Sequence, residues 1–184
     1  MNAPAYDAAV AALHRGGIVA YPTEAVYGLG CDPADATAIA RLLELKQRPA
    51  SKGLILIAAD EAALQPWLAP IDAATAACIG PTWPGATTWL LPAADDCPTI
   101  LRGEHDTLAV RVTAHPVAAG LCRAWGGALV STSANRSGGE PVRDADAARD
   151  LFGAGVDAVV DGAVGGRERP TPIRDARTGQ TLRE

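Results

Sequence analysis

Residues 128–137 read ALVSTSANRS, an apolar segment that continues without a break into hydroxyl, amide and guanidinium side chains. The pattern predicts a buried strand over residues 128–132 and a polar loop over residues 133–141. Polar loops at the ends of buried strands are where α/β folds keep their binding sites. We therefore expect this segment to join a sheet to a ligand site.

Strands and helices alternate on either side of this segment. Apolar runs predict strands at 18–21, 54–58, 87–91, 108–112 and 156–161, and short strands around a turn within 170–183. Helical spacing and caps predict helices at 6–15, 32–47, 116–125 and 144–152, and an interrupted helical stretch at 64–79. Residues 22–31 are predicted as a loop, with Asp32 capping the next helix and Pro33 at its first position. The alternation predicts an α/β domain with a mostly buried sheet.

The composition excludes some classes of protein. Hydrophobic residues make up 48% and charged residues 20%, as in ordinary globular proteins. The net charge of −5 argues against an RNA-binding module held by charge alone, since such modules are normally basic, but it allows a local basic pocket. No apolar run approaches the roughly 20 residues that span a bilayer. Residues 1–15 lack a basic start followed by an apolar core, so we expect neither a secretory signal nor a membrane span.

Several chemical motifs are missing. The sequence has no phosphate loop of the GxxxxGK[ST] type and no GxSxG elbow, and its three histidines lack metal or triad spacing. The four cysteines are scattered without zinc spacing, so we expect free thiols, a cytoplasmic location and no metal site. They are Cys31, Cys78, Cys97 and Cys122.

Three cations crowd into one short segment. The only two lysines, Lys46 and Lys52, lie six residues apart with Arg48 between them, although fourteen of the sixteen basic residues are arginines. Cations are favourable near a helix C-terminus, so a structural role is one interpretation. The same cations also suit nucleotide phosphates, with which they form charge-assisted hydrogen bonds, and they would stabilise a leaving pyrophosphate.

Arg111 is a charged residue within the apolar strand predicted at 108–112. A charge in such a place needs a partner. A buried ion pair would serve, and so would a substrate carboxylate held by the guanidinium. Residues 21–28 are a further polar segment after a strand, which is either an ordinary turn or part of the same site.

Five segments, taken in order, resemble one known family. They are YPTEAVYGLG at 21–30, LKQRPASKGLILIA at 45–58, WPGATTWLL at 83–91, LAVRVTAHP at 108–116 and STSANRSG at 131–138. The set resembles the YrdC/TsaC (RimN) family of threonylcarbamoyl-AMP synthases, most closely its short, single-domain bacterial branch. Each motif alone is weak, whereas five in this order are specific.

The resemblance implies a fold and a reaction. The fold would be one YrdC-like domain over 1–184, with a core over about 7–183, in which helices pack on a twisted mixed sheet around a large basic concave site. The activity would be that of an L-threonylcarbamoyladenylate synthase, a nucleotidyltransferase that converts L-threonine, bicarbonate or CO2, and ATP with Mg²⁺ into threonylcarbamoyl-AMP and pyrophosphate. The product would serve threonylcarbamoyladenosine modification next to the anticodon of tRNAs reading codons that begin with A. The protein would reach tRNA directly or through downstream transfer proteins.

The resemblance also implies the site residues. The catalytic pair would be Lys46 and Arg48. The ATP-binding residues would be Lys46, Arg48, Lys52, Thr107, Ser133, Asn135, Arg143 and Arg183. The threonine-binding residues would be Thr23, Tyr27, Arg111, Ser131 and Thr171.

Two positions depart from the pattern of many relatives. Ala25 replaces a threonine that touches the amino acid, and Ile57 replaces a histidine found in some relatives. Both differences bear on the threonine contacts. The loop over 92–106 is a candidate lid, on its length and polarity.

Three other functions stay open at this level. A related enzyme would activate carbamoyl groups instead of threonine. A binding module for double-stranded RNA or tRNA, with a role in ribosomal RNA maturation, would use the basic lining, although the net charge of −5 makes it the weaker choice. A paralogue without activity would keep only the fold, and the intact basic and Ser133–Asn135 motifs argue against it.

Overall fold

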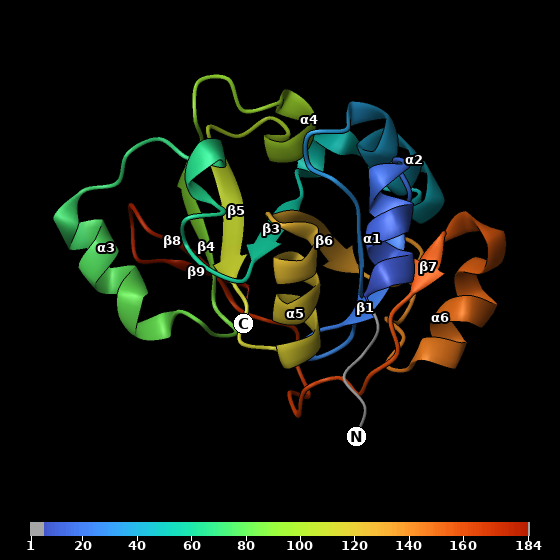
Figure 1. The fold of residues 1–184 in the computed structure, drawn as a ribbon. Helices are drawn as coiled ribbons and strands as arrows, with labels where there is room; N and C mark the ends of the chain where they lie inside the picture. Colours follow the sequence, from blue (N-terminus) through green and yellow to red (C-terminus); the bar gives the residue numbers. More distant parts are fainter. Residues whose placement is uncertain (1–5, 184) are drawn as a thin grey trace.

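The computed structural model describes residues 6–183 as nine strands in one sheet, with helices packed around it (Figure 1). The sheet order is β7-β1-β2-β6-β3-β5-β4-β8-β9. The strands are β1 Val19–Pro22, β2 Tyr27–Gly30, β3 Ile55–Ala58, β4 Thr88–Pro92, β5 Thr107–Val112, β6 Leu129–Ser133, β7 Ala158–Val159, β8 Ile173–Asp175 and β9 Thr181–Arg183. The helices are α1 Asp7–His14, α2 Ala36–Lys46, α3 Ala73–Ile79, α4 Thr99–Arg102, α5 Pro116–Trp125 and α6 Ala145–Phe152.

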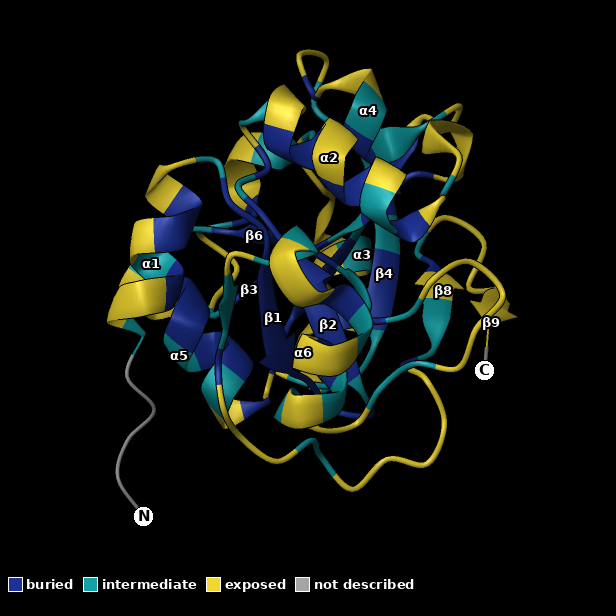
Figure 2. Ribbon diagram, turned by 90° about the vertical axis from the view of Figure 1, so that its right-hand side faces the viewer, coloured by how far each residue is buried: buried dark blue, intermediate teal, exposed yellow. Residues whose placement is uncertain are grey.

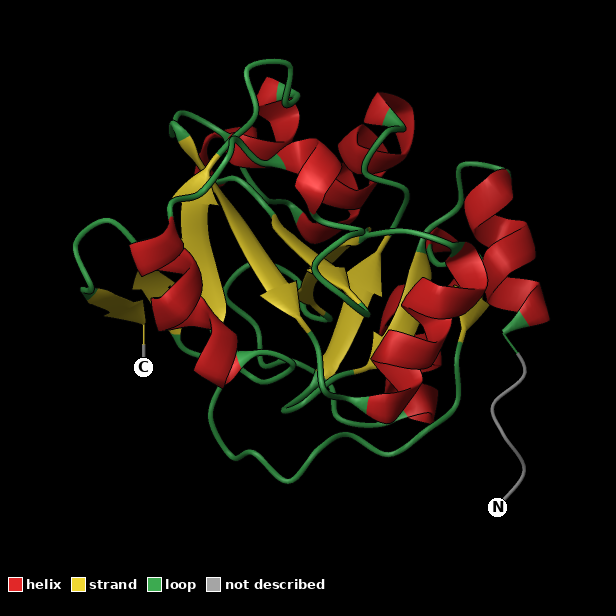
Figure 3. Cartoon of the chain, turned by 60° about the vertical axis from the view of Figure 1, so that its left-hand side comes forward, coloured by secondary structure: helices red, strands yellow, loops and turns green. Residues whose placement is uncertain are grey.

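The sheet is mixed and twisted, as predicted (Figure 3). Strand β3 pairs in parallel with β5 and antiparallel with β6, so two strands far apart in sequence flank it. The N-terminal hairpin of β1 and β2 joins the other side of β6. The tail adds β8 in parallel with β4 and turns back as β9.

The sheet separates two hydrophobic clusters. Helices α1 and α5 cover one face, where Leu13 and Leu121 pack with Leu129 and Ile57. The other face packs against α2 and α6, through a larger cluster that includes Leu42. Adjacent residues of a strand point to opposite faces, which divides each strand between the clusters. Figure 2 shows the buried strands at the centre and the exposed outer surfaces of the helices.

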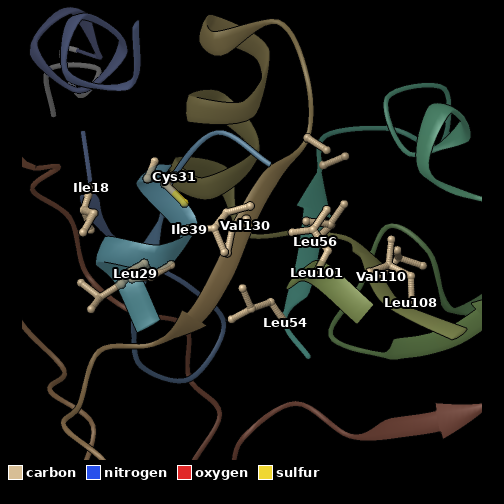
Figure 4. Packing of buried hydrophobic residues seen from close by; sticks show 14 of the residues in the cluster. Ile18, Leu29, Cys31, Ile39, Leu54, Leu56, Leu101, Leu108, Val110 and Val130 are labelled. Carbon is tan, nitrogen blue, oxygen red and sulfur yellow. The ribbon is translucent and has the colours of Figure 1, made fainter. Parts of the chain in front are cut away.

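The larger cluster is aliphatic, as the scarcity of aromatic residues requires. Leu56, Val110 and Val130 come from three adjacent strands, and Leu29 and Ile39 extend the cluster across β2 and α2 (Figure 4). Their complete burial removes apolar surface from water, the main favourable contribution to folding.

Three local predictions are wrong. Tyr27–Gly30 is a strand, not a loop, because its backbone pairs with β1 on one side and with β6 on the other. The cap of α2 is Asp35, whose carboxylate accepts from the backbone N–H groups of Thr37 and Ala38. Asp32 instead accepts from the N–H of Ala34 in the preceding turn. The loop predicted over 92–106 contains the helix α4, which packs against the segment after α2, while its role as a lid stays a prediction.

No helix within residues 6–183 is long and apolar enough to cross a membrane.

Candidate functional site

A pocket of about 510 Å³ is lined by residues of β2, β3, β5 and β6 and of the segments around them. The strand registers place its floor: Ile55 pairs with Ala109 on one side and with Ser131 on the other. The next row holds Arg111, whose partner on β3 is Ile57. The two-residue repeat of strands therefore aims these pocket residues to one face.

Ten of the thirteen predicted site residues line this pocket, although they come from segments far apart in the chain. They are Thr23, Tyr27, Arg48, Lys52, Thr107, Arg111, Ser131, Ser133, Thr171 and Arg183. The volume of the pocket falls in the range of about 300–1,000 Å³ that is typical of small-molecule sites.

The other three predicted site residues, Lys46, Asn135 and Arg143, are not among the residues that line the pocket. Lys46 ends α2 with only 4% of its surface exposed. Its ammonium donates to the backbone oxygen of Ser133 and to the backbone and side-chain oxygens of Asn135. These acceptors use the three donors of a lysine, so Lys46 fastens the loop that follows β6.

Asn135 completes the same connection. Its side-chain oxygen accepts from the Ser133 hydroxyl at 2.6 Å, and its amide donates to the backbone oxygen of Gly139 at 2.8 Å. Arg143 is exposed and donates to the backbone oxygen of Glu168. The motif predicted to contact ATP is therefore, in part, a network that shapes the loop.

Several cations line the pocket, among them Arg48, Lys52, Arg111 and Arg183. Arg48 is half-buried and donates to the backbone oxygen of Gly53, while its Nε has no partner. Lys52 is exposed at the rim. Burial lowers the pKa of Arg183, and the nearby positive charges of Arg111 and Arg48 lower it further. The guanidinium groups of Arg48, Arg111 and Arg183 are therefore close enough to influence one another, and their combined positive charge favours an anionic ligand.

Arg111 is buried in the wall of the pocket and has two kinds of partner. Its Nη1 donates to the hydroxyls of Thr88 at 2.8 Å and Thr171 at 3.2 Å. Its Nη2 lies 3.4 Å from Oε2 of Glu24, a buried carboxylate. The buried ion pair that the sequence allowed is present, and Arg111 also lines the cavity. Sequence reasoning missed Glu24 as the partner, although it lies within the quoted PTE motif.

Small and hydroxyl residues form a narrow part of the pocket. A Cβ at Gly28 would lie 3.2 Å from Cγ2 of Thr23 and 3.5 Å from Oγ of Ser131, so glycine keeps this space open. Ala25 lies in the lining, whereas Ile57 is buried in the cluster under α5. The Tyr27 hydroxyl is directed to the backbone oxygens of Gly162 and Val160. Tyr27 therefore contributes to the wall with its hydroxyl already engaged.

Three charged residues that the sequence did not point to, Asp106, Asp175 and Arg177, also line the pocket. Arg177 pairs with Asp106 at 2.8 Å and with Asp175 at 3.1 Å, joining the tail to the start of β5. Hydrogen bonding to Arg177 lowers the pKa of Asp175. Nothing in the spacing of these residues indicated that they would meet. Among residues 6–183, no group of three His, Cys, Asp or Glu side chains could hold a metal ion.

The chain is similar to proteins of known family. The Sua5/YciO/YrdC family model, described as "Telomere recombination", matches residues 11–184. A protein of Halorhodospira halophila named threonylcarbamoyl-AMP synthase is 59% identical over 175 residues, which are 95% of this chain and 92% of that protein.

Two solved structures share the fold. The crystal structure of E. coli YciO matches with a TM-score of 0.86 and 28% identity, over 97% of this chain and 88% of that chain. The crystal structure of P. abyssi Sua5 complexed with L-threonine matches with a TM-score of 0.85 and 31% identity, over 91% of this chain. The match covers 49% of that Sua5 chain, so this chain corresponds to about half of it.

Proposed function

The chain belongs to the Sua5/YciO/YrdC family, and we propose that it is an enzyme that makes threonylcarbamoyl-AMP for the modification of tRNA. The similarity to a protein of this name extends over nearly the whole length of both chains. The substrates would be ATP, L-threonine and bicarbonate. The observation that carries the proposal is one pocket in which Arg48, Arg111 and Arg183 converge beside hydroxyl side chains.

Two groups of side chains in the pocket suit the two larger substrates. Arg48, Lys52 and Arg183 would hold the phosphates of ATP, because guanidinium and ammonium groups form charge-assisted hydrogen bonds with phosphate oxygens. Arg111 would take the carboxylate of threonine, with Ser131 and Thr171 beside it. The similarity to a Sua5 structure that contains L-threonine supports this assignment.

The reaction would need positioning and electrostatic stabilisation rather than a covalent intermediate. The threonine amine reacts with CO2 to give a carbamate and loses a proton. A carbamate oxygen attacks the α-phosphorus of ATP, forming a P–O bond as the bond to the pyrophosphate oxygen breaks. Arg48 and Lys52 would stabilise the charge on the departing pyrophosphate. Lys46 would act through the loop it fastens.

Mg²⁺ would accompany ATP rather than occupy a site of its own. Magnesium is commonly bound by substrate phosphates and one or two carboxylates. The carboxylates in the pocket lining, Asp106 and Asp175, are both paired with Arg177. The ion would supply charge neutralisation at the phosphates.

We further propose that 1–184 acts as a single domain in the reducing cytoplasm, where its four free cysteines would stay reduced. The product would pass to proteins that transfer the threonylcarbamoyl group to tRNA. Direct contact with tRNA or double-stranded RNA would use the basic side of the pocket.

Pyrophosphate release tests the proposal. The purified protein is supplied with ATP, Mg²⁺ and bicarbonate, with and without L-threonine, and with L-serine as a control. We expect release that requires threonine and bicarbonate together. Stimulation by carbamoyl phosphate instead would identify a carbamoyl-activating enzyme. Salt-dependent RNA binding without turnover would identify a binding module.

Arg48→Ala tests the phosphate contact in the same assay. Losing one such cation typically lowers the rate about 10²–10³-fold. Arg123→Ala is the matched control, because Arg123 is exposed on α5 and does not line the pocket. A variant at Arg48 with the turnover of the wild type would contradict the role assigned to it.

A further inference from the structure

Arg111 has donors to spare after its contacts within the protein. A guanidinium carries five N–H donors. Nη1 uses its donors on Thr88 and Thr171, whereas Nε has no hydrogen-bond partner. Nη2 faces Oε2 of Glu24 at 3.4 Å, a distance of an ion pair rather than of a close hydrogen bond. The guanidinium is therefore oriented but not saturated.

Glu24 is fixed from behind by several segments. Its Oε1 accepts from the hydroxyl of Thr113 at 2.6 Å, and the Thr113 hydroxyl oxygen accepts from the backbone N–H of His115 at 3.1 Å. The backbone oxygen of Glu24 accepts from the N–H of Arg167. A Cβ at Gly165 would lie 2.5 Å from that oxygen, so glycine allows the tail segment to close over Glu24.

His115 continues this chain of contacts and connects it both to the segment that precedes Gly165 and to α5. Its Nε2 lies 3.1 Å from the backbone oxygen of Ala163, and its Nδ1 accepts from the N–H of Ala118 at the start of α5. Glu24 is thus connected through Thr113 to a helix terminus and cannot rotate freely.

Glu24 is the one carboxylate within ion-pair distance of Arg111 among residues 6–183. Both side chains are almost fully buried, at 10% exposure for Glu24 and 4% for Arg111. A buried guanidinium depends strongly on its charge partner, since an unpaired buried charge is costly. Glu24 therefore sets the plane and direction of the guanidinium together with the hydroxyls of Thr88 and Thr171.

We infer that Glu24 is a positioning residue that orients Arg111 toward the carboxylate of the amino-acid substrate. Glu24 does not line the pocket, although its neighbours Thr23 and Ala25 do, so it acts through Arg111 and does not touch the substrate. The inference rests on the proposed function, which places the threonine carboxylate at Arg111.

The test distinguishes the contribution of the threonine carboxylate to binding from the contribution of the rest of the substrate. Glu24→Gln keeps the shape of the side chain and an oxygen for the Thr113 hydroxyl, but removes the charge. The dissociation constants of L-threonine, of L-threoninol, which lacks the carboxylate, and of ATP are measured by calorimetry. We expect the variant to bind threonine at least tenfold more weakly, while its affinities for threoninol and ATP change less than twofold.

Three further variants, one of them a control, extend the test. Thr113→Val removes the hydroxyl that holds Oε1, so it should weaken threonine binding in the same direction but less. Combined with Glu24→Gln it should add little, because both act through one contact. Glu44→Gln, at an exposed position of α2, should change nothing.

Equal losses for threonine and threoninol would show general damage to the pocket and would overturn the inference. Unchanged threonine binding in Glu24→Gln would overturn it as well. The proposed function is judged separately, by threonine-dependent pyrophosphate release in the wild type. An active wild type with an indifferent Glu24→Gln variant contradicts the positioning role alone.

Discussion

Lys46 is a buried cation whose hydrogen-bond acceptors are all neutral oxygens. Burial, with a smaller contribution from the charge of Arg48, lowers the pKa of its ammonium from the ordinary value of 10.5 to about 8. Such a lysine is costly to keep protonated. The contacts that it makes with the loop at 133–135 explain why the position is nevertheless basic.

This shift predicts a pH dependence of stability. Between pH 8 and 10.5 the unfolded chain holds a proton on Lys46 that the folded chain has lost, so the free energy of unfolding rises with pH across this window. Urea unfolding of the wild type and of Lys46→Met measures the contribution as a difference. We expect the wild type to gain on the order of 1–2 kcal/mol relative to the variant, after allowance for solvent screening.

The variant also serves as its own control. Burial raises the pKa of Cys31 and of Cys122 to about 12, which lowers stability as pH rises above 9 in both proteins. These contributions cancel in the difference. If the curves of wild type and variant run parallel from pH 8 to 10, Lys46 keeps an ordinary pKa in the fold.

At the scale of elements, two glycines hold the basic segment in place. Gly53 and Gly103 both have positive φ, at 62° and 65°. A Cβ at Gly103 would lie 2.3 Å from the backbone oxygen of Ser51, so α4 packs directly on the turn between Arg48 and Gly53. This contact positions the turn that carries Arg48 and Lys52.

Gly103→Ala should break this contact. The substitution combines a left-handed conformation with a backbone clash, and we expect a loss of about 2–4 kcal/mol in the free energy of unfolding, with a fall in turnover. Gly126→Ala is the matched control, since Gly126 also has positive φ but open space at its Cβ, and should cost only about 1–2 kcal/mol. Equal costs in thermal and urea unfolding would show that the contact of α4 is not tight.

Several elements could be predicted from sequence because their signals are local. The helix at Pro116–Trp125 has proline at its first position and Gly126 after its end, and the prediction is confirmed. β2 could not be predicted in this way, since its glycines and tyrosine become a strand only through pairing with β1 and β6. Asp32 and Asp35 are both able to cap, and tertiary packing decides between them.

In the candidate site, too, features with local sequence signals could be predicted, whereas features that depend on distant contacts could not. The motifs at 46–53 and 131–135 indicated a phosphate and nucleotide site, but they could not show that Lys46 points into the protein. That orientation depends on contacts of Lys46 with Ser133 and Asn135, which lie 87 and 89 positions further along the chain. The pairing of Glu24 with Arg111 and of Arg177 with Asp106 likewise depends on the sheet order.

At the scale of the molecule, the pocket joins segments from both halves of the chain. Ligands that bind only the folded state stabilise it by about 2.7 kcal/mol at a hundred times their dissociation constant. For a chain of this length we expect L-threonine or ATP at that level to raise the melting temperature by about 5–10 °C. Differential scanning calorimetry measures the shift in melting temperature. D-threonine is the control, and an equal shift with it would argue against a shaped amino-acid site.

The sheet order also governs when the protein becomes competent during its synthesis. β7 forms one edge of the sheet beside β1, and β8 and β9 form the other edge, so Thr171 and Arg183 reach the pocket only after every strand from β1 to β7 has been made. At roughly 5–20 residues per second, a ribosome needs about 10–40 s for the chain. A nascent chain halted near residue 165 contains most of the strands yet lacks part of the pocket wall. The residues that complete the pocket wall, Thr171 and Arg183, are therefore among the last to be synthesised.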